Sequence, residues 1–216
     1  MLGALQLAFI DSVNLLLIGV IVAVGIAARS NYAKTTALLI AGDWCGVAGL
    51  ALIMLVIFDG LGPVVQRFVE GPVFGILLIA TGVLTAVLAV RGGDNQALVQ
   101  KIMRPLRTPG PATVGTGMVL GLIQSATSLP FYGGLALLSA AGVDAQVRYA
   151  AIPLYATVAL SLPTLAALAV GWVRAKPDSA AARGFDWARA HPDQVTAAAT
   201  WSVAVLLIVL GVTHVV

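Results

Sequence analysis

Six long apolar segments constrain this sequence more than any motif does. Each runs for about twenty residues or more, the length that an α-helix needs to cross roughly 30 Å of membrane hydrocarbon. Within lipid only helices or closed barrels satisfy every backbone hydrogen bond, and no segment alternates as a barrel strand does. The sequence therefore predicts a single all-α integral membrane domain over 1–216, with six transmembrane helices near 2–28, 35–58, 72–90, 112–141, 148–173 and 195–216.

The composition of the chain, and its small number of side chains suited to catalysis, argue against several classes of protein. The chain is 60% hydrophobic and 10% charged, whereas about a quarter of the residues in soluble domains are charged. Its basic residues lie in short loops and form no continuous stripe, so nucleic acid is not an expected partner. One cysteine, Cys45, and two isolated histidines, His191 and His214, offer no metal cluster, and no phosphate-binding loop occurs. We therefore expect neither an enzyme nor a cofactor.

The loops between the segments carry a strongly asymmetric charge. Ten of the twelve Lys and Arg residues fall in the first, third and fifth loops, and only Arg67 and Arg148 fall in the others. The positive-inside rule places the basic loops in the cytoplasm and both termini outside, in the cytoplasmic (inner) membrane. In the fifth loop both charge signs surround Phe185 and Trp187, which predicts a short amphipathic helix along the interface.

A Gly- and Pro-rich linker divides the segments into halves, 1–91 and 112–216, with the linker over 92–111. Because three segments precede it, the first and fourth helices enter from opposite sides, which is the topology of two inverted three-helix repeats. The linker's basic residues are a topology signal or, as a weaker alternative, a binding site for anionic lipid headgroups. These residues are Lys101, Arg104 and Arg107.

Two polar clusters occupy equivalent positions of the two halves. A shift of 113 positions pairs Asp11 with Gln124, Ser12 with Ser125 and Asn14 with Thr127. The second cluster continues into Ser128 and Pro130, and the proline predicts a kinked or partly unwound fourth helix. Broken helices often line transport cavities, so we expect a substrate or proton pathway at these residues, with helix packing as the alternative.

Two acids lie within the predicted membrane helices. An ionised Asp at a helix centre costs roughly 2.5–3.5 kcal/mol, and apart from Arg148 at the edge of the fifth segment no Lys or Arg lies within a segment to neutralise Asp11 or Asp43. Gly42 and Gly46 flank Asp43 and allow another helix to approach it closely, so Asp43 is expected to meet helix one or four. The acids are candidates for a proton or cation relay; hydrogen bonding that only ties helices together is the alternative.

The pattern resembles the LysE superfamily of small six-helix exporters with inverted repeats, and within it the actinobacterial glycolipid-addressing (GAP/Sap-like) proteins. The residues that carry the resemblance are the polar-broken helix at 9–14, the basic turn at 29–34, the basic linker, the segment 185–191 and the final helix ending at 210–212. The resemblance implies outward delivery of cell-envelope glycolipids or lipid-linked molecules. Other members of the superfamily export amino acids or metal ions.

The predicted function is that of a secondary transporter or flippase for an envelope lipid or lipid-linked sugar, coupled to protons through Asp11 and Asp43. One alternative is an exporter of a small polar solute or cation. Another is a non-transporting accessory subunit of an envelope-assembly complex, docking through small-residue faces such as 117–121. The expected partners are membrane lipids, a second copy of the chain or an envelope-assembly protein.

Overall fold

The computed structural model describes residues 2–27, 31–91, 104–106, 108–176 and 178–215, and within these ranges the chain is helical with no strand. The first helices are α1 (Leu2–Asp11), α2 (Leu15–Ala27), α3 (Tyr32–Gly60), α4 (Gly62–Glu70) and α5 (Pro72–Arg91). After the short 3-10 helix η1 (Arg104–Leu106) come α7 (Pro111–Ala126), α8 (Leu129–Ser139), α9 (Ala145–Ala150), α10 (Ile152–Ala159), α11 (Ser161–Ala175), α12 (Ala180–Ala190) and α13 (Pro192–Val215).

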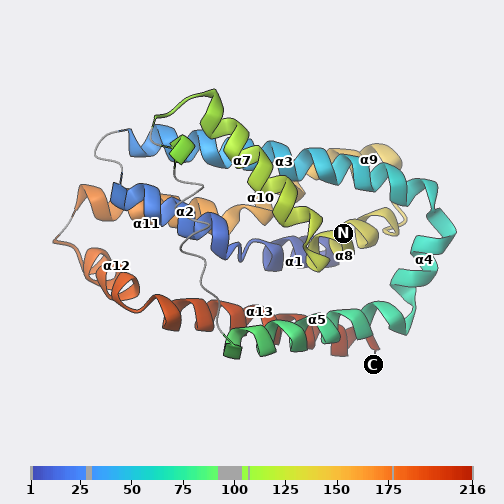
Figure 1. Ribbon diagram of the computed structural model, residues 1–216. Helices are drawn as coiled ribbons and strands as arrows, with labels where there is room; N and C mark the ends of the chain where they lie inside the picture. Colours follow the sequence, from blue (N-terminus) through green and yellow to red (C-terminus); the bar gives the residue numbers. More distant parts are fainter. Residues whose placement is uncertain (1, 28–30, 92–103, 107, 177, 216) are drawn as a thin grey trace.

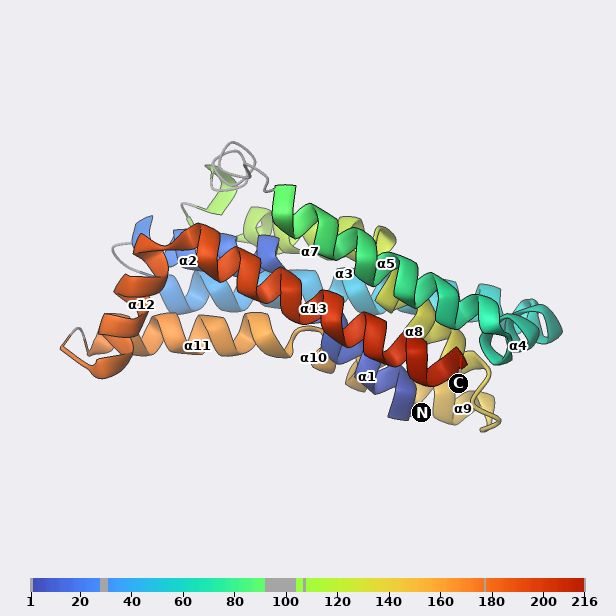
Figure 2. The ribbon, with the colours of Figure 1, turned by 90° about the horizontal axis from the view of Figure 1, so that it is seen from below.

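The helices form an elongated bundle in which most axes run roughly along its length (Figure 1). In that view α3 and α7 form one side, α5 and α13 form the other, and α1, α2, α10 and α11 lie between them. Helix α4 crosses one end of the bundle and joins α3 to α5, while α12 joins α11 to α13 at the opposite end. Both termini lie in the half of the bundle toward α4, also when the bundle is seen from below (Figure 2).

One described helix, α3, is long and apolar enough to cross a membrane alone. Three bent pairs also qualify when each is taken as one span, with bends of 48° between α1 and α2, 65° between α4 and α5, and 42° between α10 and α11. Shorter apolar helices occur at Leu129–Ser139 and Ala204–Thr213. The structure thus shows an all-helical protein with at least one candidate span and up to four by length and composition.

Three predicted spans are broken. The predicted first helix ends at Asp11 and restarts at Leu15, and the fourth ends at Ala126 and restarts at Leu129. The break in the fourth segment agrees with the prediction from Pro130. This proline lies in the first turn of α8, where a backbone N–H has no partner within the helix, so the missing N–H of proline costs no hydrogen bond. The predicted fifth helix becomes α9, α10 and α11, with Pro153 in the first turn of α10.

Helix α4 forms where the sequence predicts a loop between the second and third segments. It buries Val65 and Val69, which are four residues apart and so share one helix face. The amphipathic helix expected in the fifth loop is present as α12. Lys101 and Arg107 of the linker lie outside the described residues, and Arg104 begins η1, so headgroup binding there stays a prediction.

Glycines bring α3 and α7 into backbone contact. A Cβ atom added at Gly42 or Gly46 of α3 would collide with the carbonyl oxygen of Val114 or Met118 of α7. Reciprocally, Gly117 and Gly121 of α7 lie against the carbonyl oxygens of Leu39 and Asp43. The spacing of four residues on both helices predicts this kind of approach. The contact places Asp43 against α7.

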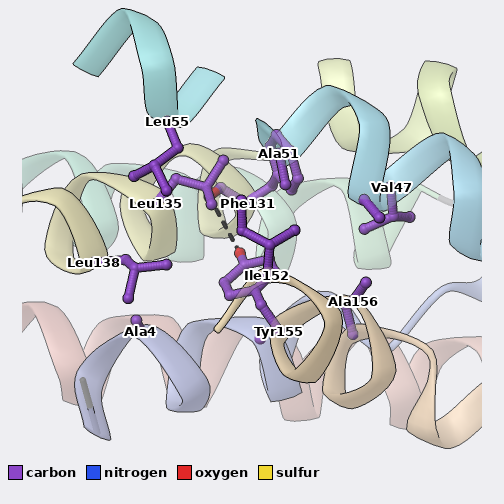
Figure 3. Close-up of a cluster of buried hydrophobic side chains, with 13 residues drawn as sticks. Ala4, Val47, Ala51, Leu55, Phe131, Leu135, Leu138, Ile152, Tyr155 and Ala156 are labelled. Atoms are coloured by element: carbon purple, nitrogen blue, oxygen red, sulfur yellow. Dashed lines mark hydrogen bonds between the residues drawn. The ribbon is translucent and has the colours of Figure 1, made fainter. Parts of the chain in front are cut away.

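The largest apolar cluster joins α1, α3, α8 and α10 (Figure 3). The rings of Phe131 and Tyr155 meet edge to face with centroids 6.1 Å apart, and the buried Tyr155 hydroxyl donates to the Phe131 carbonyl oxygen at 3.2 Å. A side chain at Gly134 would strike the Tyr155 ring. This cluster ties the residues that follow the α7–α8 break to helices of both halves.

We predict that Gly42→Ala and Gly117→Ala each lower the free energy of unfolding by about 1–3 kcal/mol, since each added methyl group meets backbone of the facing helix. Gly49→Ala on α3 and Gly115→Ala on α7 are matched controls with open space around the added methyl. They should be neutral or stabilising by up to about 1 kcal/mol. Thermal unfolding of the detergent-solubilised variants measures this. Equal stability of Gly42→Ala and Gly49→Ala would contradict the close packing.

Candidate functional site

The break between α1 and α2 is held by its own polar side chains. Asn14 Oδ1 accepts a hydrogen bond from the backbone N–H of Leu17 at 2.9 Å and thereby caps α2. The Ser12 hydroxyl donates to the carbonyl oxygen of Phe9, and Ser12 is fully buried. These bonds satisfy backbone groups that the interruption frees inside an apolar bundle. Asn14 and Ser12 therefore have a local structural role at this break.

The break between α7 and α8 connects to the first one through Ser128. Its hydroxyl oxygen accepts from the backbone N–H of Phe131 at 3.2 Å, which caps α8, and the same hydroxyl donates to Asp11 Oδ1. The Thr127 hydroxyl donates back to the carbonyl oxygen of Ile123 at 3.0 Å. One serine thus joins the interruption of one half of the chain to the acid of the other half.

A cavity of about 290 Å³ lies where these breaks meet α3. Its polar lining comes from both halves of the chain. The polar residues are Asp11, Asn14, Asp43, Gln124, Ser125, Thr127 and Ser128. Apolar lining comes in part from Ala159 and Leu160, at the junction between α10 and α11. Three interrupted helical segments therefore converge on one polar cavity.

Asp43 is the least satisfied group at this cavity. Its side chain is fully buried, and neither carboxylate oxygen has a hydrogen-bond partner among the described residues. The amide nitrogen and oxygen of Gln124 are buried and equally without partners there. Buried polar groups are nearly always paired, so these unpaired atoms are free to accept a bond from a proton, a cation, water or a hydroxyl group that enters the cavity.

The charge at the cavity is acidic, since none of the described residues that line it is basic. Asp11 and Asp43 are the two ionisable lining groups, contributed by α1 and α3. A proton or cation, or a hydroxyl group that donates to carboxylate and amide oxygens, suits this lining. An anion does not, because two nearby carboxylates repel it.

Asp59, near the end of α3, is an acid whose two carboxylate oxygens both have partners, in contrast to Asp43. Its Oδ2 atom pairs with Arg148 Nη2 at 3.0 Å, and its Oδ1 atom accepts from the Ser139 hydroxyl at 2.7 Å. The pair joins α3 to α9 and to the end of α8. Asp59 was not considered a site residue in the sequence, and its pairing gives it a structural role.

The structure brings together seven of the nine residues that the sequence predicted for a pathway, and the pathway itself stays a prediction. Ser12 and Pro130 do not line the cavity: Ser12 turns to Phe9, and Pro130 is buried in the first turn of α8. Leu160 was missed, although Pro163 signals a break in the same segment. Its apolar side chain gave no hint of the cavity.

The fold and the site together define a helical membrane protein with an acidic cavity lined in part by broken helices. Over residues 5–213 the chain matches the family described as Sap, sulfolipid-1-addressing protein, and it belongs to that family. No curated protein and no solved structure matches the chain. The family confirms the Sap-like part of the resemblance and indicates involvement in lipid export or addressing, whereas the wider LysE relationship stays a prediction.

We predict that Asp43→Asn raises the free energy of unfolding at neutral pH by about 1–3 kcal/mol, because it removes a buried charge that has no partner. Asp59→Asn is the matched control on the same helix. It should destabilise the protein by about 1 kcal/mol, since it leaves Arg148 without its ion pair. Thermal unfolding in detergent compares the two. A loss of stability in Asp43→Asn would show that Asp43 has a binding partner that stabilises the fold.

Proposed function

We propose that the protein is a secondary transporter or flippase-like protein that moves an envelope lipid or lipid-linked sugar outward across the cytoplasmic membrane, without enzymatic activity. The observation that carries this proposal is the convergence of three interrupted helical segments and two acids on one cavity within the bundle. Membership of a family named for lipid addressing supports a lipid as cargo. Acids that face a cavity in a membrane protein are typical of proton or cation pathways.

The proposal includes six spans arranged as two inverted three-helix repeats. In such an arrangement α1–α2 corresponds to α7–α8, α3 to α9–α11, and α5 to α13. The packing of α3 on α7 then corresponds to the packing of α10 and α11 on α1 and α2, and both contacts occur. Helices α5 and α13 would pack on each other across the repeat axis, and Gly82 and Gly211 make reciprocal close approaches between them. These matched pairs support an inverted repeat.

The proposed orientation places the α4 end of the bundle outside. Helices α4 and α9, which contain Arg67 and Arg148, lie at this end, and both termini lie toward it (Figure 1). The end of α2, the start of α3 and helix α12 lie at the other end, and they flank or belong to the basic first and fifth loops. The two ends of the bundle thus match the charge asymmetry that the positive-inside rule uses.

Proton or cation coupling is proposed to act through the contact between Asp11 and Ser128. The Ser128 hydroxyl caps α8 and donates to Asp11 at the same time, so a proton arriving on Asp11 removes the charge that this bond stabilises. The change affects both helix breaks, because Asp11 is the last residue of α1 and Ser128 is the N-cap of α8. A local change of charge can in this way bias two arrangements of the halves.

The volume of the cavity also suits the alternative of a small polar solute or cation, since 290 Å³ is too small for a whole glycolipid. Flux of a radiolabelled amino acid or a metal ion, in place of lipid movement, would favour this alternative. The accessory-subunit alternative loses the docking face named for it, because Gly117 and Gly121 pack against α3. A homo-oligomer or an envelope-assembly partner would need another surface.

We predict that Asp11→Asn lowers the rate of lipid movement at least about tenfold and abolishes its dependence on a pH gradient, because the variant cannot exchange a proton at this position. The measurement is a dithionite-quenching assay of fluorescent glycolipid in proteoliposomes with an imposed pH gradient.

Asp144→Asn is the control for this assay, since Asp144 is exposed and does not line the cavity. It should retain the rate and the pH response of the unaltered protein. Lipid movement that is unchanged in Asp11→Asn would rule out the coupling role and, with it, the proposed mechanism.

A further inference from the structure

We propose that a second, apolar cavity between α3, α4, α5 and α8 holds an acyl chain of the transported amphiphile, whose uncharged, hydroxyl-bearing polar part meets the acidic cavity. This inference rests on the proposed function and names the substrate class of the same site. The apolar cavity has a volume of about 300 Å³. That is the lower end of the roughly 300–1,000 Å³ of small-molecule sites, enough for a segment of chain and not for a whole lipid.

The lining of this cavity suits hydrocarbon. Residues from four helices contribute to it, among them Phe58, Val65, Phe68, Leu77, Leu129 and Tyr132. Tyr132 carries the one polar side-chain group among the lining residues, and its hydroxyl donates to the carbonyl oxygen of Ala126 at 3.1 Å. A headgroup would lose its hydrogen bonds with water here and gain none, whereas an acyl chain loses nothing.

Consecutive residues at the start of α8 line the two cavities. Ser128 lines the acidic cavity, and the next residue, Leu129, lines the apolar one. Consecutive Cα atoms are about 3.8 Å apart, so the backbone at this turn borders both cavities. An amphiphile with its polar part against Asp11 and Ser128 can therefore place a chain against Leu129 and Tyr132. From this shared border we infer that the occupant of the apolar cavity is the cargo's own chain.

The apolar cavity also opens toward the side of the bundle. Val64 of α4 is 65% exposed and Leu77 of α5 is 38% exposed, yet both line the cavity. Helix α4 is kept in place over it by the buried Val65 and Val69. A chain can thus enter from the bilayer between α4 and α5 without leaving an apolar environment.

The polar part of the cargo is identified by the lining of the acidic cavity. Carboxylate and amide oxygens of Asp11, Asp43 and Gln124 accept hydrogen bonds from hydroxyl groups. None of the described lining residues is basic, and the two carboxylates repel a sulfate or a phosphate. An uncharged sugar suits this lining, and an anionic headgroup does not.

The test uses the full-length protein in phosphatidylcholine vesicles and a dodecyl glucoside with a diazirine in the middle of its chain. After irradiation, labelled peptides are mapped by mass spectrometry. We expect labelling concentrated on α4, the start of α5 and the first turns of α8, and lost on addition of unlabelled dodecyl glucoside. Dodecyl sulfate should need at least about fivefold higher concentration to compete. Equal competition by dodecyl sulfate would overturn the assignment of an uncharged headgroup.

Val64→Trp and Leu77→Trp fill the mouth of the cavity from two different helices, so the test does not depend on the folding of one variant. Both should reduce labelling at least about fivefold. Val209→Trp on α13 is the matched control, with a 52% exposed residue outside the cavity, and should leave labelling unchanged. Labelling spread evenly over the exposed faces of α7 and α13, or unaffected by both mouth variants, would mean annular lipid only and would overturn the proposal.

The outcome is distinguishable from failure of the proposed function. Absence of cavity labelling, together with lipid movement that depends on Asp11, would remove the acyl-chain site and leave the transporter. Competed labelling in the cavity, together with movement that is unaffected by Asp11→Asn, would leave the binding site and remove the coupling mechanism.

Discussion

The close contact between α3 and α7 is the constraint on which the rest of the structure depends. Four glycines, two on each helix, remove the side chains that would keep the two backbones apart. The approach sets Asp43 against Gly121 and near Gln124 and Ser125, so an acid from one half of the chain reaches the polar residues of the other. With ordinary side chains at these positions, Asp43 would be separated from α7 and the acidic cavity would lose one wall.

The polar residues in the bundle fall into two groups with different physics. Asn14, Thr127 and Ser128 satisfy backbone or capping needs at the two helix breaks, so they allow an interruption inside an apolar environment. The side chains of Asp43 and Gln124 make no hydrogen bond among the described residues. The first group stabilises the helix breaks that line the cavity, and the second group supplies unpaired polar atoms that can bind a ligand. Asp11 belongs to both groups, since it accepts a hydrogen bond from Ser128 and also lines the cavity.

The two cavities together have the form expected of a binding site for an amphiphile. One is acidic and lies where three interrupted segments meet; the other is apolar, and residues exposed on α4 and α5 line its mouth. They share the first turn of α8, whose position is set by the Phe131 and Tyr155 cluster and by the Ser128 cap. A change at the cap therefore reaches both cavities. This arrangement is compatible with the lipid role that the family indicates.

The sequence by itself determined the helical membrane class, the break at Pro130 and the identity of most cavity residues. Hydropathy, proline geometry and the cost of an acid in lipid act locally, so each can be judged from the chain alone. Only the tertiary structure decided that Asp11 meets Ser128, that Asp43 is left unpaired, and that Ser12 and Pro130 are excluded from the cavity. It also decided the place of α4 and the apolar cavity beneath it. These depend on which helix faces pack together, and that is set by contacts between residues far apart in the chain.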